Sequence, residues 1–237
     1  MGKMVGLSRN LKMTWLNKAV ELLSGNLSEK EYKDKLNEYL SFEIKSPTNL
    51  RKTREILMSL WYYENSELQS LRAQAWSLLK KDPDNALAAH WSIILATYPI
   101  FVDVSRIIGK LSEFEEEFTL RQLKQKLFDE WGERATLFHS IDKIIATMKA
   151  MDALRAEKPG HYTIVRHEVR DNEINALLAS TGMTVEDKGN FTLQDLRSMS
   201  YMFPFKYQIE RDMLMTNHEF TITNIGGEMM VSLTASL

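Results

Sequence analysis

The chain has 237 residues, of which 44% are hydrophobic and 26% charged, with no cysteine and a formal net charge of −2 at neutral pH. This length buries one sizeable core or two smaller ones, and the lack of cysteine excludes disulfides, thiolate metal sites and a thiol nucleophile. The small net charge argues against a uniformly basic nucleic-acid-binding surface. The sequence has no apolar run typical of a signal peptide or a membrane span, so we expect a cytoplasmic protein without membrane contact.

The charges are distributed in blocks along the chain. Residues 1–60 carry a net charge of +4 and residues 118–170 one of +3, whereas residues 61–117 and 171–237 carry −4 and −5. Two basic segments between acidic ones indicate local anion-binding surfaces. Random clustering explains the blocks equally well, so other features must decide.

Residues 1–110 are predicted to form a helical bundle. A first helix ends at Gly25, and a second begins at Ser28, which forms a capping box with Glu31 because each side chain reaches the other residue's backbone N–H. A third helix begins at Pro47, since proline in the first turn of a helix loses no hydrogen bond. The remaining expected helices contain residues 68–78, 87–95 and 102–111, with breaks at Asp82-Pro83 and Pro99.

Residues 111–169 are predicted to form a winged-helix module. The expected order is helix, helix, turn, long helix, tight turn and strand, with Thr119 as the cap of one helix and Gly132 as its stop. The long helix begins near Thr136. Its apolar residues recur at helical spacing and are expected to form one buried stripe: Leu137, Ile141, Ile144, Ile145, Met148 and Met151.

The opposite face of the long helix is the first candidate DNA-binding surface. It carries no carboxylate, which suits contact with phosphates and base edges in a major groove, and it consists of Thr136, His139, Lys143, Thr147 and Ala150. The turn over residues 155–161 and the β-prone run after it are predicted to form the wing. Cations of this wing and of the preceding helix are expected to contact phosphate, namely Arg155, Lys158, His161, Arg121, Lys124 and Lys126. The alternative is a winged helix that docks protein.

A second candidate surface lies at the start of the third helix. Its cations are Lys45, Arg51, Lys52 and Arg54. Positive charge near a helix start opposes the helix dipole, so these residues do not stabilise the helix. Phosphate contact explains the patch, and a solvated face explains it equally well.

Residues 170–237 are predicted to form a small α+β segment. We expect a helix over residues 172–179, a turn at Thr181-Gly182, a further helix near Leu193, and a hairpin over residues 220–233 that turns at Gly226-Gly227. An isolated hairpin is marginally stable, so this one must pack on the rest of the chain. No internal repeat of fixed period is evident in the sequence.

The sequence carries no recognisable catalytic motif. The five histidines lack metal-ligand spacing, and there is no Gly-rich phosphate loop and no nucleophile elbow. We therefore expect a non-enzymatic protein without a cofactor or a metal.

Four segments carry a resemblance to a known family. They are Glu21-Leu22-Leu23-Ser24-Gly25 with Ser28, Ile44-Lys45-Ser46-Pro47-Thr48, Ala96-Thr97-Tyr98-Pro99 with Phe101-Val102-Asp103, and Trp131-Gly132-Glu133-Arg134. Over about its first two thirds the chain resembles BrxA-like proteins of bacterial BREX (bacteriophage exclusion) defence systems. The resemblance implies a helical or winged-helix accessory protein that binds double-stranded DNA beside larger enzymatic partners, and Thr48, Arg51 and Arg54 fall where that family has early Thr and Arg positions. The chain departs from the family after Val169.

The leading hypothesis is thus a non-catalytic double-stranded DNA-binding accessory protein of a phage-defence system, with other defence proteins as partners and a homo-oligomer as one possible form. Two alternatives stay open. One is an assembly adaptor whose winged helix docks proteins, and the other is a winged-helix transcriptional regulator that reads an operator as a dimer. Contacts with phosphate alone do not separate DNA from RNA.

Overall fold

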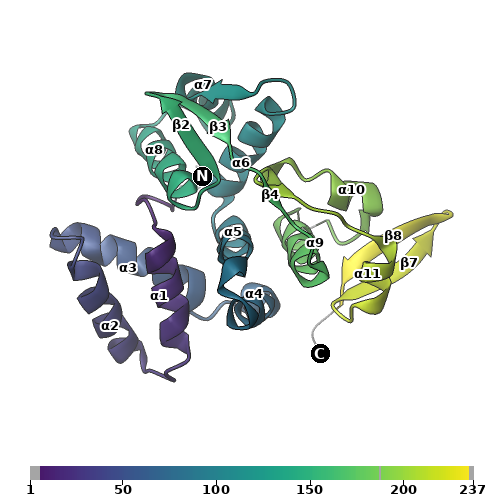
Figure 1. The fold of residues 1–237 in the computed structure, drawn as a ribbon, viewed down its shortest axis with the longest axis horizontal. Helices are drawn as coiled ribbons and strands as arrows, with labels where there is room; N and C mark the ends of the chain where they lie inside the picture. The colour runs from purple at the N-terminus through teal and green to yellow at the C-terminus, as the bar shows by residue number, and fades with distance from the viewer. Residues whose placement is uncertain (1–5, 187, 235–237) are drawn as a thin grey trace.

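The protein is mainly helical, with three small sheets. The computed structural model describes residues 6–186 and 188–234, so the outermost residues of the first and third expected units lie outside it. Figure 1 shows α1–α3 on one side, a helix-and-sheet unit with α7 and α8 at the top, and the C-terminal unit on the other side, with α4 and α5 between them.

The helices of the first 111 residues begin and end close to where the sequence predicts. Ser28 forms the predicted capping box with Glu31, and Pro47 occupies the first turn of its helix. Pro99, expected only as a stop, also begins the next helix. The elements are α1 (Met13–Leu23), α2 (Glu29–Ser41), α3 (Pro47–Trp61), η1 (Ser66–Leu68), α4 (Gln69–Lys81), η2 (Pro83–Asn85), α5 (Ala86–Thr97) and α6 (Pro99–Leu111).

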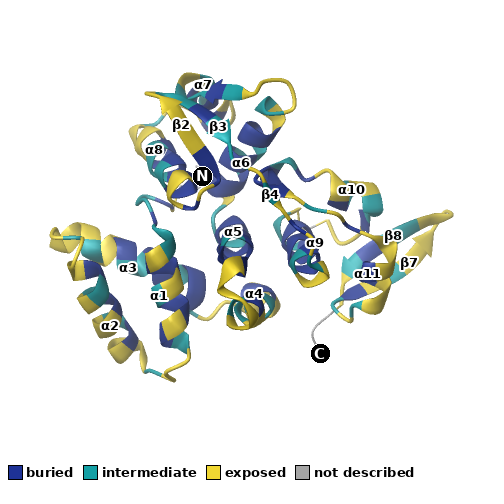
Figure 2. Cartoon of the chain, in the orientation of Figure 1, coloured by how far each residue is buried: buried dark blue, intermediate teal, exposed yellow. Residues whose placement is uncertain are grey.

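The centre of the main core is α5, which is buried on nearly all sides (Figure 2). Trp91 of this helix is fully buried, and its ring contacts Phe101 of α6 and Phe203 edge-on at centroid distances of 4.9 and 5.2 Å. Edge-to-face pairs of this kind add to the stability gained from area burial. The helices α5 and α6 therefore connect the N-terminal helices to everything that follows.

Residues 117–164 form the helix-and-sheet unit on which the candidate site lies. Its elements are β1 (Glu117–Thr119), α7 (Leu120–Trp131), α8 (Ala135–Ala150), β2 (Leu154–Lys158) and β3 (His161–Ile164), and the antiparallel strand order is β1-β3-β2. Thr119 caps α7 as predicted, Gly132 ends it with a φ of 75°, and the predicted apolar stripe of α8 is buried.

Two predictions for this unit are wrong. Strand β1 was not expected, because three residues between a glutamate run and a helix cap give no strand period. The expected turn over residues 155–161 is mostly strand, since β2 continues to Lys158 and only Pro159-Gly160 turn.

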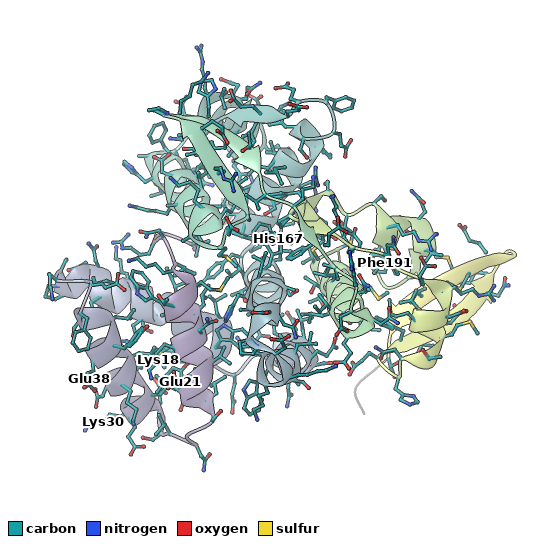
Figure 3. The ribbon with its side chains drawn as sticks, in the orientation of Figure 1. Lys18, Glu21, Lys30, Glu38, His167 and Phe191 are labelled. Atoms are coloured by element: carbon teal, nitrogen blue, oxygen red, sulfur yellow. The ribbon has the colours of Figure 1, made fainter. Side chains whose placement is uncertain are left out.

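A short parallel pair joins this unit to the C-terminal part: β4 (His167–Glu168) with β6 (Phe205–Lys206). His167, labelled in Figure 3, lies at this junction. Its backbone N–H donates to the Pro204 carbonyl at 2.7 Å, and its Nε2 lies 2.8 Å from the Asp152 carbonyl oxygen at the end of α8. His167 thus forms hydrogen bonds both with the helix-and-sheet unit and with the C-terminal part.

Apart from a short 3-10 helix and strand β6, which lie between its second and third α-helices, the C-terminal unit repeats the order of elements found from α6 to β3. Both run helix, strand, capped helix, helix, strand, strand, and both three-stranded sheets have the last strand in the middle. Thr192 forms a capping box at the end of its strand, as Thr119 does. The elements are α9 (Asn172–Glu186), β5 (Phe191–Thr192), α10 (Leu193–Arg197), η3 (Ser200–Met202), α11 (Arg211–Thr216), β7 (Phe220–Ile225) and β8 (Glu228–Leu233), with strand order β5-β8-β7.

The predicted hairpin and the helix at Leu193 are confirmed, but the turn predicted at Thr181-Gly182 is wrong. Helix α9 continues through both residues, because Gly182 is where Met199 packs against it. The hairpin packs on a second, smaller core that includes Phe191, Leu214 and Val231.

Within the described residues, no single helix is long and apolar enough to cross a membrane. The helical segments Pro83–Thr97 and Pro99–Leu111 are long and apolar enough only when taken together, and the chain bends by 117° between them.

Candidate nucleic-acid interface

The N-terminal half of α8 presents the polar face that the sequence predicts. Thr136 and His139 are exposed and Lys143 is half-buried. Among the described residues Lys143 forms no ion pair. Its ammonium group is therefore available to an anion outside the chain.

Farther along the same face Ala150 is exposed but Thr147 is covered, so the prediction that Thr147 is exposed is wrong. Thr147 is fully buried, and its hydroxyl accepts a hydrogen bond from the backbone N–H of Leu11 at 2.9 Å. The N-terminal segment, with buried Leu7 and Leu11, lies over this end of α8. Helical spacing places Thr147 correctly on its face, but it carries no information on a segment that arrives from far along the chain.

The cations of the β2–β3 hairpin differ in their surroundings. Arg155 is exposed on β2, and among described residues it forms no ion pair. His161 Nδ1 contacts the Glu117 carboxylate, and Lys158 Nζ lies 3.9 Å from the same carboxylate. Glu117 belongs to β1, the unpredicted strand, so its contact with these cations was not predictable from local sequence patterns. Glu117 thus lies beside both Lys158 and His161, whereas no carboxylate among the described residues pairs with Arg155.

Arg121 and Lys126 are exposed on α7, whereas Lys124 is not available for phosphate contact, contrary to prediction. Lys124 is 9% exposed. Its Nζ lies 2.6 Å from the Asp142 carboxylate of α8 and 3.4 Å from the centroid of the Phe138 ring. Lys124 therefore links α7 to α8, because its ammonium group contacts Asp142 and the Phe138 ring and its alkyl chain is buried within the unit.

Phe138 is a surface residue that the sequence analysis missed. It is 43% exposed and stacks on Phe128 with a centroid distance of 6.4 Å. The two rings line an open cavity of about 590 Å³ between the start of α7, the start of α8 and the turn at Pro159-Gly160. The sequence does contain a signal for this surface, because Phe138 is an aromatic residue outside the predicted buried stripe, directly after the stripe residue Leu137.

The second candidate patch is only partly free. Arg51 and Lys52 are exposed on α3, and Lys45 Nζ donates to the Ser41 carbonyl at 3.0 Å. Arg54 is the exception: its side chain is 16% exposed, with its guanidinium on the Glu55 carboxylate and 3.2 Å from Asn37 Oδ1. The expectation of a free cation at Arg54 is therefore wrong, because a neighbouring glutamate on the same helix pairs with it.

Comparison of the chain with protein-family models, with curated protein sequences and with solved structures finds no match. In the described part of the chain, no group of three or more His, Asp or Glu side chains is placed to hold a metal ion.

Proposed function

We propose that the winged-helix module predicted over residues 111–169 is formed by the elements from β1 to β3 together with the preceding helix α6, and that the chain is a non-catalytic double-stranded DNA-binding protein. The observation that carries the proposal is the element order α6-β1-α7-α8-β2-β3 with strand order β1-β3-β2, together with the polar face of the N-terminal half of α8, where Thr136 and His139 are exposed and the one carboxylate, Asp142, is paired with Lys124. In this proposal α8 is the recognition helix and the β2–β3 turn is the wing.

The exposed groups fit the way such a module meets DNA. Recognition helices contact base edges with their N-terminal residues, and here Thr136 and His139 are the exposed polar side chains in that half. The N-terminal segment covers only the other end of α8, at Thr147, so it leaves this half open. Lys143 and Arg155 are the cations assigned to phosphate, since neither pairs with a carboxylate among described residues.

Fluorescence anisotropy with a mixed-sequence DNA duplex, over a salt series, tests the proposal. The double reversal Lys143→Glu/Arg155→Glu should weaken binding by at least about tenfold and reduce the salt slope by about two, because two phosphate contacts are lost. The matched control is Lys30→Glu/Arg211→Glu, which changes charge equally at exposed positions; Lys30 lies on α2 at the lower left of the view, whereas α8 lies at the upper left (Figures 1 and 3).

A preference for duplex DNA over duplex RNA is expected, because side chains cannot enter the deep, narrow major groove of A-form RNA. Reversal at Arg51 and Lys52 measures what the α3 patch adds. Equal loss in the double reversal and in its control would show that net charge, not this surface, governs binding, and absence of binding by folded wild type at low salt would overturn the proposal.

Protein docking is the second candidate function. Exposed Phe138 and the cavity beside it are the observation in its favour, because an exposed aromatic over a cavity suits an apolar side chain from a partner. No binding to either duplex would favour this adaptor role. A transcriptional regulator would instead bind one operator and discriminate strongly against the mixed-sequence duplex.

On the resemblance to BrxA-like proteins, we also propose that the chain works beside other proteins of a bacterial phage-defence system. In that setting DNA binding is its contribution, and the chemistry belongs to its partners.

A further inference from the structure

The outer edge of β7 is the one long strand edge that the described structure leaves unprotected. Strand β7 lies at the edge of its sheet, in a hairpin that projects at one end of the molecule (Figure 1). Its residues from Thr223 to Ile225 are exposed. An edge strand presents a row of backbone donors and acceptors that another strand can pair with.

The register identifies which backbone groups are free. Thr234 N–H donates to the Glu219 carbonyl at 2.9 Å, in line with the β7–β8 register. Because antiparallel hydrogen bonding alternates from residue to residue, Thr221, Thr223 and Ile225 pair with β8. The N–H and C=O groups of Ile222 and Asn224 therefore point to the open edge, and in the described chain none of them bonds elsewhere.

The repeated topology supplies an internal comparison, because β2 occupies the same edge position in the other unit. Strand β2 carries Arg155, Glu157 and Lys158 and has a register shift before Lys158. Charges and bulges are the ordinary means of blocking an edge. Strand β7, with the sequence Phe-Thr-Ile-Thr-Asn-Ile, has no charge, no proline and an unbroken register.

The other outer strands of these two sheets, β1 and β5, are three and two residues long, and so short an edge offers little to pair with. Length, charge and register thus single out β7. The β7 edge therefore lacks the features that block β2, although a single lysine on β7 would be enough to block it.

We propose that β7 pairs with β7 of a second copy of this chain, antiparallel and about a two-fold axis, so that two three-stranded sheets become one of six strands. Ile222 of each copy hydrogen-bonds with Asn224 of the other, and Thr223 then lies directly opposite Thr223 at the axis. A second copy fits because residues 220–225 are uncharged: any antiparallel register of this segment with itself opposes no like charges. Apolar surface flanks the edge, since Ile225 is 57% exposed and Met215 of the contacting helix α11 is 58% exposed.

The second core keeps the edge in place. Phe191, labelled in Figure 3, pairs in register with Val231 on the central strand β8, and Phe220 of β7 is buried in the same cluster. The alternation of β7 then places Thr221 and Thr223 on the opposite sheet face, where a substitution does not enter this core. Thr223 is exposed and can be changed without loss of packing.

Sedimentation velocity over a concentration series, without nucleic acid, tests the proposal independently of DNA binding. Wild type should dimerise, and Thr223→Lys should weaken dimerisation at least tenfold because two lysines would meet across the axis. The control Ser232→Lys adds the same charge on the same sheet face but on β8, which β7 separates from the edge. A wild type that stays monomeric throughout the micromolar range overturns the proposal and leaves the edge for a strand of another protein.

Cysteine cross-linking locates the interface, since the chain has no cysteine of its own. Thr223→Cys should give a covalent dimer under mild oxidation, because directly opposed residues of antiparallel strands lie within disulfide reach. Thr221→Cys, which lies opposite Ile225 of the other copy, and Ser232→Cys on the central strand should not. A dimer that persists in Thr223→Lys and does not cross-link through Thr223→Cys would overturn the assignment to β7.

Discussion

The side chain of Thr147 holds the backbone of Leu11, a residue 136 positions earlier in the chain. The hydroxyl accepts the Leu11 N–H at 2.9 Å and donates to the Lys143 carbonyl at 2.9 Å, so both of its roles are used. This bond fixes the N-terminal segment across the C-terminal half of α8. The half of α8 that remains exposed is the half we assign to DNA.

Thr147→Val should lower the free energy of unfolding by about 1–3 kcal/mol, because the shape is kept while the buried Leu11 N–H loses its acceptor. Urea denaturation measures the change. Thr136→Val, at an exposed position of the same helix, should change stability by no more than about 0.5 kcal/mol. Similar losses in the two variants would contradict the role of this hydrogen bond.

Lys124→Met should leave both the DNA affinity and the salt slope unchanged, because the ammonium group is already held by Asp142. Lys143→Met removes a cation that is unpaired among the described residues and should lower the slope by about one. Methionine keeps the length of the buried stem in both variants. Anisotropy titrations compare them, and a slope that falls in Lys124→Met would show that this ion pair opens on the DNA.

Local signals in the sequence were enough to predict most helix starts and the buried stripe of α8. Caps such as Ser28 and Thr119 act within one turn, and the stripe follows from helical spacing, so neither depends on the rest of the fold. The hairpin at Gly226-Gly227 was predictable for the same reason. These are contacts between residues that are close in the chain.

The site was predicted less well because its limits are set by distant residues. Leu11 covers Thr147, Asp142 pairs with Lys124, and Glu117 contacts His161. None of these three contacts follows from helical spacing or a local capping pattern, so neither periodicity nor a motif predicts them. The repeat of the two units was also missed, since they share an order of elements and a capped strand end but no fixed sequence period.

Stability should fall as the pH is lowered from neutral, in part because of His90. This residue is fully buried between helices, with its Nε2 2.8 Å from Asn17 Oδ1, and burial lowers its pKa from 6.5 to about 3. Between these values the unfolded chain binds a proton that the folded chain does not. The contribution of the neutral ring is therefore complete above pH 6.5 and is lost as the pH falls toward 3, at about 1.4 kcal/mol per pH unit.

The test compares urea denaturation of wild type and His90→Gln at pH 7 and pH 5. The wild type should lose about 2 kcal/mol more than the variant over this interval, because the part from pH 6.5 to pH 5 lies below the unfolded pKa and above the folded one. Equal losses would mean that His90 does not set the acid sensitivity. The variant's own stability at pH 7 is the reference, so any packing defect cancels.

Two helical glycines offer a graded test of how the units are joined. A Cβ at Gly109 of α6 would lie 1.9 Å from the Ser200 carbonyl oxygen, whereas one at Gly182 of α9 would lie 2.0 Å from the Met199 Sδ. Backbone at Ser200 cannot move without shifting η3, but the methionine side chain can change rotamer. Alanine also gains about 1 kcal/mol of helix propensity at each site.

Gly109→Ala should therefore lower the free energy of unfolding by about 3 kcal/mol, at the upper end of overpacking costs, and Gly182→Ala by about 1 kcal/mol. Thermal and urea denaturation of the two variants give the comparison. Removing the side chain that clashes distinguishes the two sites. Met199→Ala in the Gly182→Ala background should restore packing room. No side-chain change at Ser200 can relieve Gly109→Ala, because that clash is with the backbone. Equal losses of unfolding free energy in the two variants would show that η3 moves away from α6 as readily as the Met199 side chain changes rotamer.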